Sequence, residues 1–182
     1  MALWFPYALG AALLASFNPI VVKRLLGDTD VAVVAWAGQA FALPLLGLTL
    51  VTFFGPLPRV DGMFVVGIAG SAGLNAAAHL AVTRAYKDAD ASLVSPLLAV
   101  SPAITLLVSV FTLREILTPL PILGVALIIL GVYLLNLRST RDFAGPLREL
   151  LHNRSHLLAL FAGLLWGLTP IFEKTAIRHT FP

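Results

Sequence analysis

Long apolar runs, separated by short polar connections, occupy almost the whole sequence. A helix needs about 20 mostly apolar residues to cross a hydrocarbon core of about 30 Å. Six runs meet that length: Leu3 to Leu26, Val31 to Phe54, Met63 to Tyr86, Ala91 to Leu113, Pro119 to Leu137 and Ser155 to Ile177. They are rich in Leu and Ala and lack the period-2 alternation of membrane barrel strands. The pattern predicts an all-α membrane protein, a multi-pass helical bundle with six spans.

The composition supports this class of protein and limits the kinds of partner that it can bind. Hydrophobic residues make up 59% of the chain and charged residues 12%, with a mean hydropathy of +0.94. Soluble domains have roughly 45–50% apolar and 25% charged residues. We therefore expect an integral protein of the cell membrane, in contact with lipids. The 12 Lys and Arg are spread over short connections, so no basic patch predicts a nucleic-acid partner.

The fifth connection is longer than the others and is weakly amphipathic. Phe143, Leu147, Leu150 and Leu151 stand at i, i+4, i+7 and i+8, and Pro146 suits a first helical turn. We expect an interfacial helix on the membrane surface. A solvated linker is the alternative.

A segment near the end of the sequence repeats a segment near its start. From Ala8 to Lys23 against Ala159 to Lys174, at a constant offset of 151 residues, 8 of 16 positions are identical. A repeat that restarts at the sixth span has a unit of five helices, and an odd number of spans inverts the second unit. Inverted repeats are characteristic of secondary transporters. The alternative is that two unrelated helices share Leu, Ala and Pro by composition.

The run from Ala85 to Leu135 also carries a recognisable set of motifs. It resembles the end of an EamA domain of the drug/metabolite transporter superfamily, and LLWGLTPIFEK (164–174) resembles the opening helix of such a domain. The matching elements are Ala91-Ser92-Leu93, Ser101-Pro102, Arg114-Glu115 with Thr118, and Gly124 with Gly131.

The resemblance implies ten helices in two inverted halves and the export or exchange of small metabolites. We expect residues 1–137 to form a five-helix EamA-like domain, 138–154 a linker, and 155–182 the first helix of a truncated second repeat. On this interpretation the chain is a fragment that requires a homodimer or a missing second half. The first and sixth spans should be antiparallel, and the sixth should be the least stably packed element.

Prolines are expected to break the helices of the spans at four positions. Pro19, Pro96, Pro102 and Pro170 each remove a backbone donor, and such breaks are tolerated where they face protein or water. The hydroxyls of Ser92, Ser95, Ser101 and Thr105 either bind the freed carbonyls or line a cavity. By contrast, Gly67, Gly70, Gly73 and Ala77 give the third span a small face suited to close packing.

Polar side chains within the spans are the candidate substrate-binding residues. They are Asn75, His79, Asn18, Gln39, Ser95 and Ser101. Asn75 and His79, at i and i+4, share one helix face, which we expect to point toward the first and fourth spans. His79 is a candidate for proton coupling. Simple interhelical hydrogen bonding, worth about 1 kcal/mol or less, is the alternative role for these groups.

These observations predict a secondary carrier or exporter of small metabolites or drugs that acts by alternating access. A non-transporting remnant or partner subunit is the main alternative. An intramembrane enzyme is disfavoured, because the nine carboxylates lie at or near span ends and the four histidines are scattered. No cofactor and no metal is expected.

Overall fold

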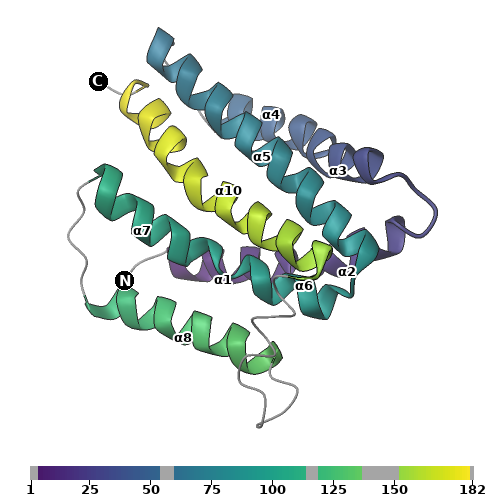
Figure 1. The fold of residues 1–182 in the computed structure, drawn as a ribbon. Helices are drawn as coiled ribbons and strands as arrows, with labels where there is room; N and C mark the ends of the chain where they lie inside the picture. The colour runs from purple at the N-terminus through teal and green to yellow at the C-terminus, as the bar shows by residue number, and fades with distance from the viewer. Residues whose placement is uncertain (1–3, 54–59, 114–118, 137–151, 181–182) are drawn as a thin grey trace.

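A computed structural model describes residues 4–53, 60–113, 119–136 and 152–180 of the chain. These residues form α-helices and no strand, as the apolar pattern predicts (Figure 1). The helices are α1 (Trp4–Ala15), α2 (Asn18–Leu25), α3 (Val31–Ala40), α4 (Ala42–Phe53), α5 (Gly62–Asp88), α6 (Ala91–Leu98), α7 (Ser101–Leu113), α8 (Pro119–Asn136) and α10 (Arg154–Arg178).

Five stretches of the described residues are long and apolar enough to cross a membrane: Phe5–Leu25, Val31–Phe53, Gly62–Asp88, Ala91–Phe111 and Arg154–Arg178. The first, second and fourth each consist of two consecutive helices. The predicted fifth span corresponds to α8, whose apolar stretch Pro119–Leu134 is shorter than the other five. Within the described residues five stretches thus reach membrane length, and the count of six spans in the whole chain stays a prediction.

Interruptions of the first and fourth spans occur where the prolines predict them. The first span turns at Ser16 and Phe17, and Pro19 lies in the first turn of α2. The fourth turns at Ala99 and Val100, between Pro96 and Pro102. The second span also turns, at Phe41, a break that we did not predict. Pro44 accounts for it, because a proline cannot donate to the carbonyl four residues before it.

The sixth span is not interrupted at Pro170, contrary to our prediction. Pro170 lies inside the continuous helix α10. The Trp166 carbonyl, which has lost its backbone donor, accepts a hydrogen bond of 2.8 Å from the Thr169 hydroxyl. The neighbouring Gly167 carbonyl accepts one of 3.3 Å from Thr105 of α7. The Thr169 hydroxyl thus takes the place of the donor that Pro170 lacks, and the helix continues through the proline.

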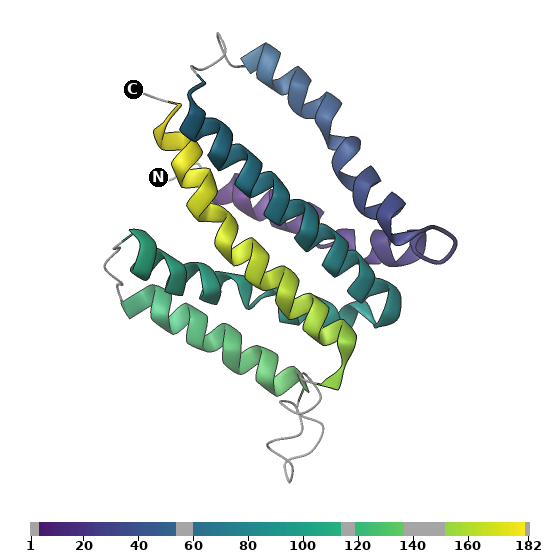
Figure 2. The ribbon, with the colours of Figure 1, turned by 45° about the horizontal axis from the view of Figure 1, so that its top comes forward.

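The expectation that the sixth span packs least stably was wrong. Helix α10 lies along α5, with α6 and α7 on its other side (Figures 1 and 2). Of the residues in its apolar stretch 44% are buried, against 0% for the first span. Glycines allow this close approach: a Cβ at Gly67 would lie 2.7 Å from the Phe172 carbonyl oxygen, and one at Gly70 would collide with the Phe172 ring. Helix α10 therefore has the most thoroughly buried apolar stretch of the five candidate spans.

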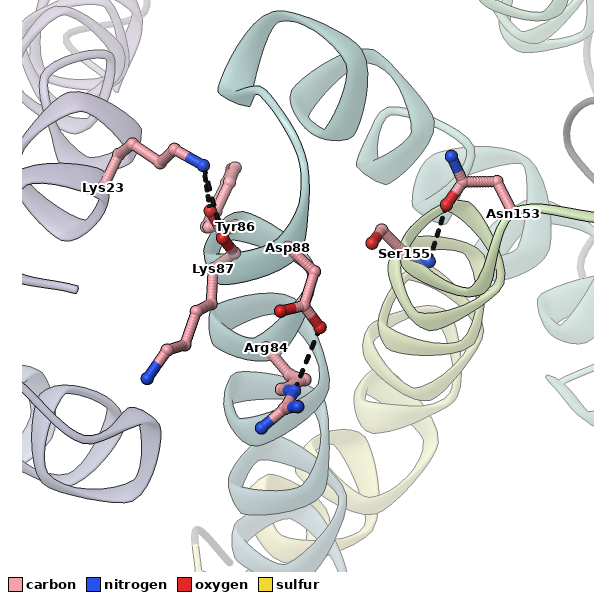
Figure 3. A network of polar contacts seen from close by, with 7 residues as sticks. All are labelled: Lys23, Arg84, Tyr86, Lys87, Asp88, Asn153 and Ser155. Carbon is pink, nitrogen blue, oxygen red and sulfur yellow. Dashed lines mark hydrogen bonds and ion pairs between the residues drawn. The ribbon is translucent and has the colours of Figure 1, made fainter. Parts of the chain in front are cut away.

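Contacts at the two ends of α5 establish the direction of its neighbours. At its C-terminal end, Lys23 of α2 donates to the Tyr86 carbonyl at 2.7 Å (Figure 3) and to the Ala89 carbonyl at 2.8 Å. At its N-terminal end, Asp61 accepts from the Phe64 backbone N–H and pairs with His179, the residue after α10. The first span thus runs parallel to α5 and α10 antiparallel to it. The predicted antiparallel relation of the first and sixth spans is confirmed, whereas their superposition by a two-fold axis stays a prediction.

The predicted interfacial helix of the fifth connection, with Phe143, Pro146, Leu147, Leu150 and Leu151, lies outside the described residues. Where the structure resumes, Asn153 caps α10: its side chain accepts a hydrogen bond of 2.9 Å from the Ser155 backbone N–H (Figure 3). This cap agrees with the predicted start of the sixth span near Ser155.

Candidate functional site

Helix α5 carries a stripe of polar side chains halfway along its length. Ser71, Asn75 and His79 follow one another at intervals of four residues and therefore share one face of the helix. Asn75 is at the centre of Gly62–Asp88, and all three residues are partly buried. We call these three residues the polar stripe. It faces the second and sixth spans through the contacts described next.

His79 lies between two helices other than its own. Its Nε2 atom is 3.0 Å from Nε2 of Gln39 on α3. Because an amide nitrogen only donates, His79 Nε2 accepts this bond, and the neutral ring then carries its proton on Nδ1. The Trp166 ring of α10 meets the imidazole edge to face, with centroids 5.2 Å apart. The partners of His79 are thus on the second and sixth spans, not on the first and fourth as expected.

The other end of the polar stripe reaches a carboxylate. Asn75 Nδ2 donates to the Ser71 carbonyl (3.0 Å) and to Ser71 Oγ (3.3 Å). Ser71 Oγ in turn donates to Glu173 Oε1 of α10 at 3.2 Å. An amide, a hydroxyl and a carboxylate therefore form one chain of hydrogen bonds between α5 and α10.

A cavity of about 410 Å³ adjoins this chain, between α7 and α10. Thr105 and Ser109 contribute polar groups from α7, and Glu173 and Lys174 from α10. Gly167 and Pro170 complete the α10 wall, where the proline has displaced the backbone hydrogen bonding. Glu173 thus connects the polar stripe on one side with the cavity on the other.

The other predicted binding residues do not join this cluster. Asn18 is exposed at the start of α2. Ser95 forms a hydrogen bond of 3.1 Å with the Tyr86 hydroxyl, near the end of α5. Ser101 begins α7, with its backbone against Gly163 and Gly167 of α10. Of the six candidates, the structure therefore brings together Asn75, His79 and Gln39, and it places Asn18, Ser95 and Ser101 elsewhere.

Glu173 and Ser71 are the residues that sequence reasoning missed. Glu173 stands five residues before the end of α10, so it was counted among the carboxylates at span ends. The antiparallel packing of α10 brings it to Ser71, nine residues into α5. The signal in the sequence was one acidic residue within the apolar run LLWGLTPIFEK.

The model of the EamA-like transporter family matches residues 2–137, which contain α1 to α8. The chain belongs to the EamA-like transporter family. It is therefore an integral membrane protein of a transporter family, as its apolar helices also indicate. No curated protein and no solved structure matches the chain.

Membership in the EamA-like family agrees with the resemblance found in the run from Ala85 to Leu135 and with the helical fold. The match ends before α10. The division into a first unit, a linker and the first helix of a second unit stays a prediction. Among the described residues, no group of three or more His, Asp or Glu side chains is placed to hold a metal ion.

Proposed function

We propose that this EamA-like protein is a secondary carrier or exporter of small metabolites or drugs in the cell membrane, and that it works by alternating access. The observation that carries the proposal is the polar stripe of α5, joined to Gln39 at one end and to Glu173 at the other. Polar groups at this depth in a membrane protein mark substrate or ion pathways. The adjoining cavity between α7 and α10 offers space for a small solute.

Each predicted residue has a role in this proposal. Asn75, His79 and Gln39 contact the substrate, and His79 couples transport to protons, since an imidazole side chain can take up and release a proton. Asn18, Ser95 and Ser101 contact the substrate in other conformations of the cycle. The breaks at Pro19 and between Pro96 and Pro102 allow the first and fourth spans to bend during that cycle.

Alternating access needs a second, inverted unit opposite the first. The repeat makes α10 the counterpart of the first span, and the two run antiparallel. Their burial differs: α10 is packed among α5, α6 and α7, whereas the apolar stretch of the first span has no buried residue. Either a homodimer or a missing second half supplies the partner that covers the first span.

A flux measurement on assemblies of defined size tests this proposal. The purified chain is cross-linked, separated by size, reconstituted into proteoliposomes loaded with a mixture of small metabolites, and the released solutes are identified by mass spectrometry. We expect release from an assembly with two five-helix units and none from the cross-linked monomer. Release by the monomer contradicts the two-unit mechanism.

The same experiment addresses the alternative functions. If no assembly releases any solute faster than protein-free liposomes loaded with the same mixture, the chain is a non-transporting remnant or a partner subunit. An intramembrane enzyme would instead convert lipid or peptide substrates without moving a solute. The described residues offer no paired membrane aspartates for that chemistry, since their aspartates lie at helix ends or in connections.

A further inference from the structure

The α7 wall of the cavity presents hydrogen-bond acceptors. Thr105 Oγ1 donates its proton to the Gly167 carbonyl at 3.3 Å, and Ser109 Oγ donates its proton to the Leu106 carbonyl at 2.9 Å. A hydroxyl whose single proton is engaged retains lone pairs that accept. Toward a bound molecule, both residues of this wall therefore act as acceptors.

Glu173 adds an anion to the same cavity. The Ser71 hydroxyl points its proton at Glu173, because its oxygen already accepts from Asn75 Nδ2. Within the part of the chain that the structure describes, Glu173 forms no ion pair. A carboxylate accepts about four hydrogen bonds, so one bond from Ser71 leaves most of its capacity for a ligand.

We propose that this cavity binds the ammonium group of a small organic amine, with Glu173 as the counter-ion and Thr105 and Ser109 as neutral acceptors. A protonated amine supplies several N–H donors together with the positive charge, and hydrogen bonds to ionised groups are the strong ones. The apolar side chains of Leu106, Ile171 and Ile177, which also line the cavity, receive the hydrocarbon part. This inference rests on the proposed transport function and names a substrate class for it.

Lys174 of α10 also lines the cavity, and its positive charge limits where the ammonium group binds. Successive residues of an α-helix project about 100° apart, so Lys174 leaves α10 in a different direction from Glu173. It makes an interaction of its own. The ammonium group therefore binds beside Glu173, between this carboxylate and the hydroxyls of Thr105 and Ser109.

Binding to the purified full chain in detergent tests the inference without any flux. The probe is radiolabelled 2-phenylethylammonium, and the competitor is 2-phenylethanol, a neutral molecule of similar shape. We expect saturable binding that Glu173→Gln weakens by roughly tenfold to a hundredfold, since the lost hydrogen bond is one to a charged group. Glu173→Asp keeps the charge and should retain part of the affinity.

A matched control is Asp28→Asn, which removes the same charge from the exposed connection between α2 and α3 and should bind as the wild type does. A single symmetric peak in size-exclusion chromatography establishes that each variant is folded. If Glu173→Gln does not fold, the comparison of 2-phenylethylammonium with 2-phenylethanol on the wild type decides.

Three outcomes overturn the inference: no saturable binding to the wild type, equal affinity in folded Glu173→Gln, or equal competition by 2-phenylethanol. Because the readout is binding, its failure is separable from failure of the transport proposal. A chain that releases other solutes but does not bind the amine refutes the substrate class alone.

Discussion

Gly67 of α5 lies directly against Phe172 of α10, so close that a Cβ at Gly67 would come within 2.7 Å of the Phe172 carbonyl oxygen and 2.8 Å of the Ala176 backbone nitrogen. Both of these neighbours are backbone atoms and cannot rotate away. The absence of a side chain at Gly67 is therefore a condition for the packing of α10 on α5. That packing brings Glu173 to Ser71 and Trp166 to His79.

Gly67→Ala should destabilise the folded chain by about 1–3 kcal/mol, the usual cost of overpacking a well-filled interface. Gly73→Ala is the matched control, because a Cβ there meets nothing within 4 Å, and alanine favours the helix by up to about 1 kcal/mol. Thermal unfolding in detergent, followed by tryptophan fluorescence, measures both. Equal midpoints for the two variants would contradict the contact between α5 and α10.

The Thr169 hydroxyl should matter only while residue 170 is a proline. Thr169→Val removes the donor to the Trp166 carbonyl and should cost roughly 0.5–1.5 kcal/mol, the net value of one hydrogen bond. In a Pro170→Ala background the introduced alanine supplies a backbone N–H to that carbonyl, so the cost should fall toward zero. A double-mutant cycle of thermal stabilities measures the coupling. Additive effects would show that Thr169 does not replace the missing backbone donor.

Asp61 should make stability depend on pH in acid. Its pKa lies below the usual 3.8, because the Phe64 backbone N–H and then the His179 side chain donate to the carboxylate. A lowered folded-state pKa stabilises above the unfolded value, and the contribution is lost as pH falls through the folded pKa. Asp61→Asn should therefore lower the melting temperature at pH 7, and its difference from wild type should shrink below about pH 4. A difference that stays constant from pH 7 to pH 3 would refute this.

The spans and two of their breaks could be predicted from the sequence, because both follow from local properties. Length and hydropathy predict the crossings, and Pro19 and Pro102 each stand two residues after a turn. The turn at Phe41 could also have been predicted, since Pro44 follows it in the sequence. The continuity of α10 at Pro170 was not predictable from the proline alone, because it accompanies a Thr169 hydroxyl bond to the freed Trp166 carbonyl and the packing of α10 among α5, α6 and α7.

The candidate site depended on packing that periodicity does not reveal. The sequence places Asn75 and His79 on one helix face, and the structure agrees. It gives His79 partners on α3 and α10, whereas Asn75 donates to Ser71 of its own helix. The small face of the third span was predicted, and of its three glycines Gly67 and Gly70 lie against α10 whereas Gly73 does not. Glu173 was missed because its depth follows from the antiparallel offset of two helices, which no single-helix pattern contains.

The central claim is that the polar stripe of α5 lines a transport pathway, and His79→Ala tests it most directly. The variant is compared with wild type for solute release from proteoliposomes and for folded yield, in the assembly that transports. Thr49→Val is the matched control, because Thr49 donates to the Leu46 carbonyl of its own helix α4, away from the polar stripe.

We predict that His79→Ala lowers the release rate by roughly tenfold or more, a transition-state loss of about 1.4 kcal/mol, while the folded yield changes little and Thr49→Val transports normally. Equal proportional losses of release and folded yield would contradict the account and assign His79 to packing.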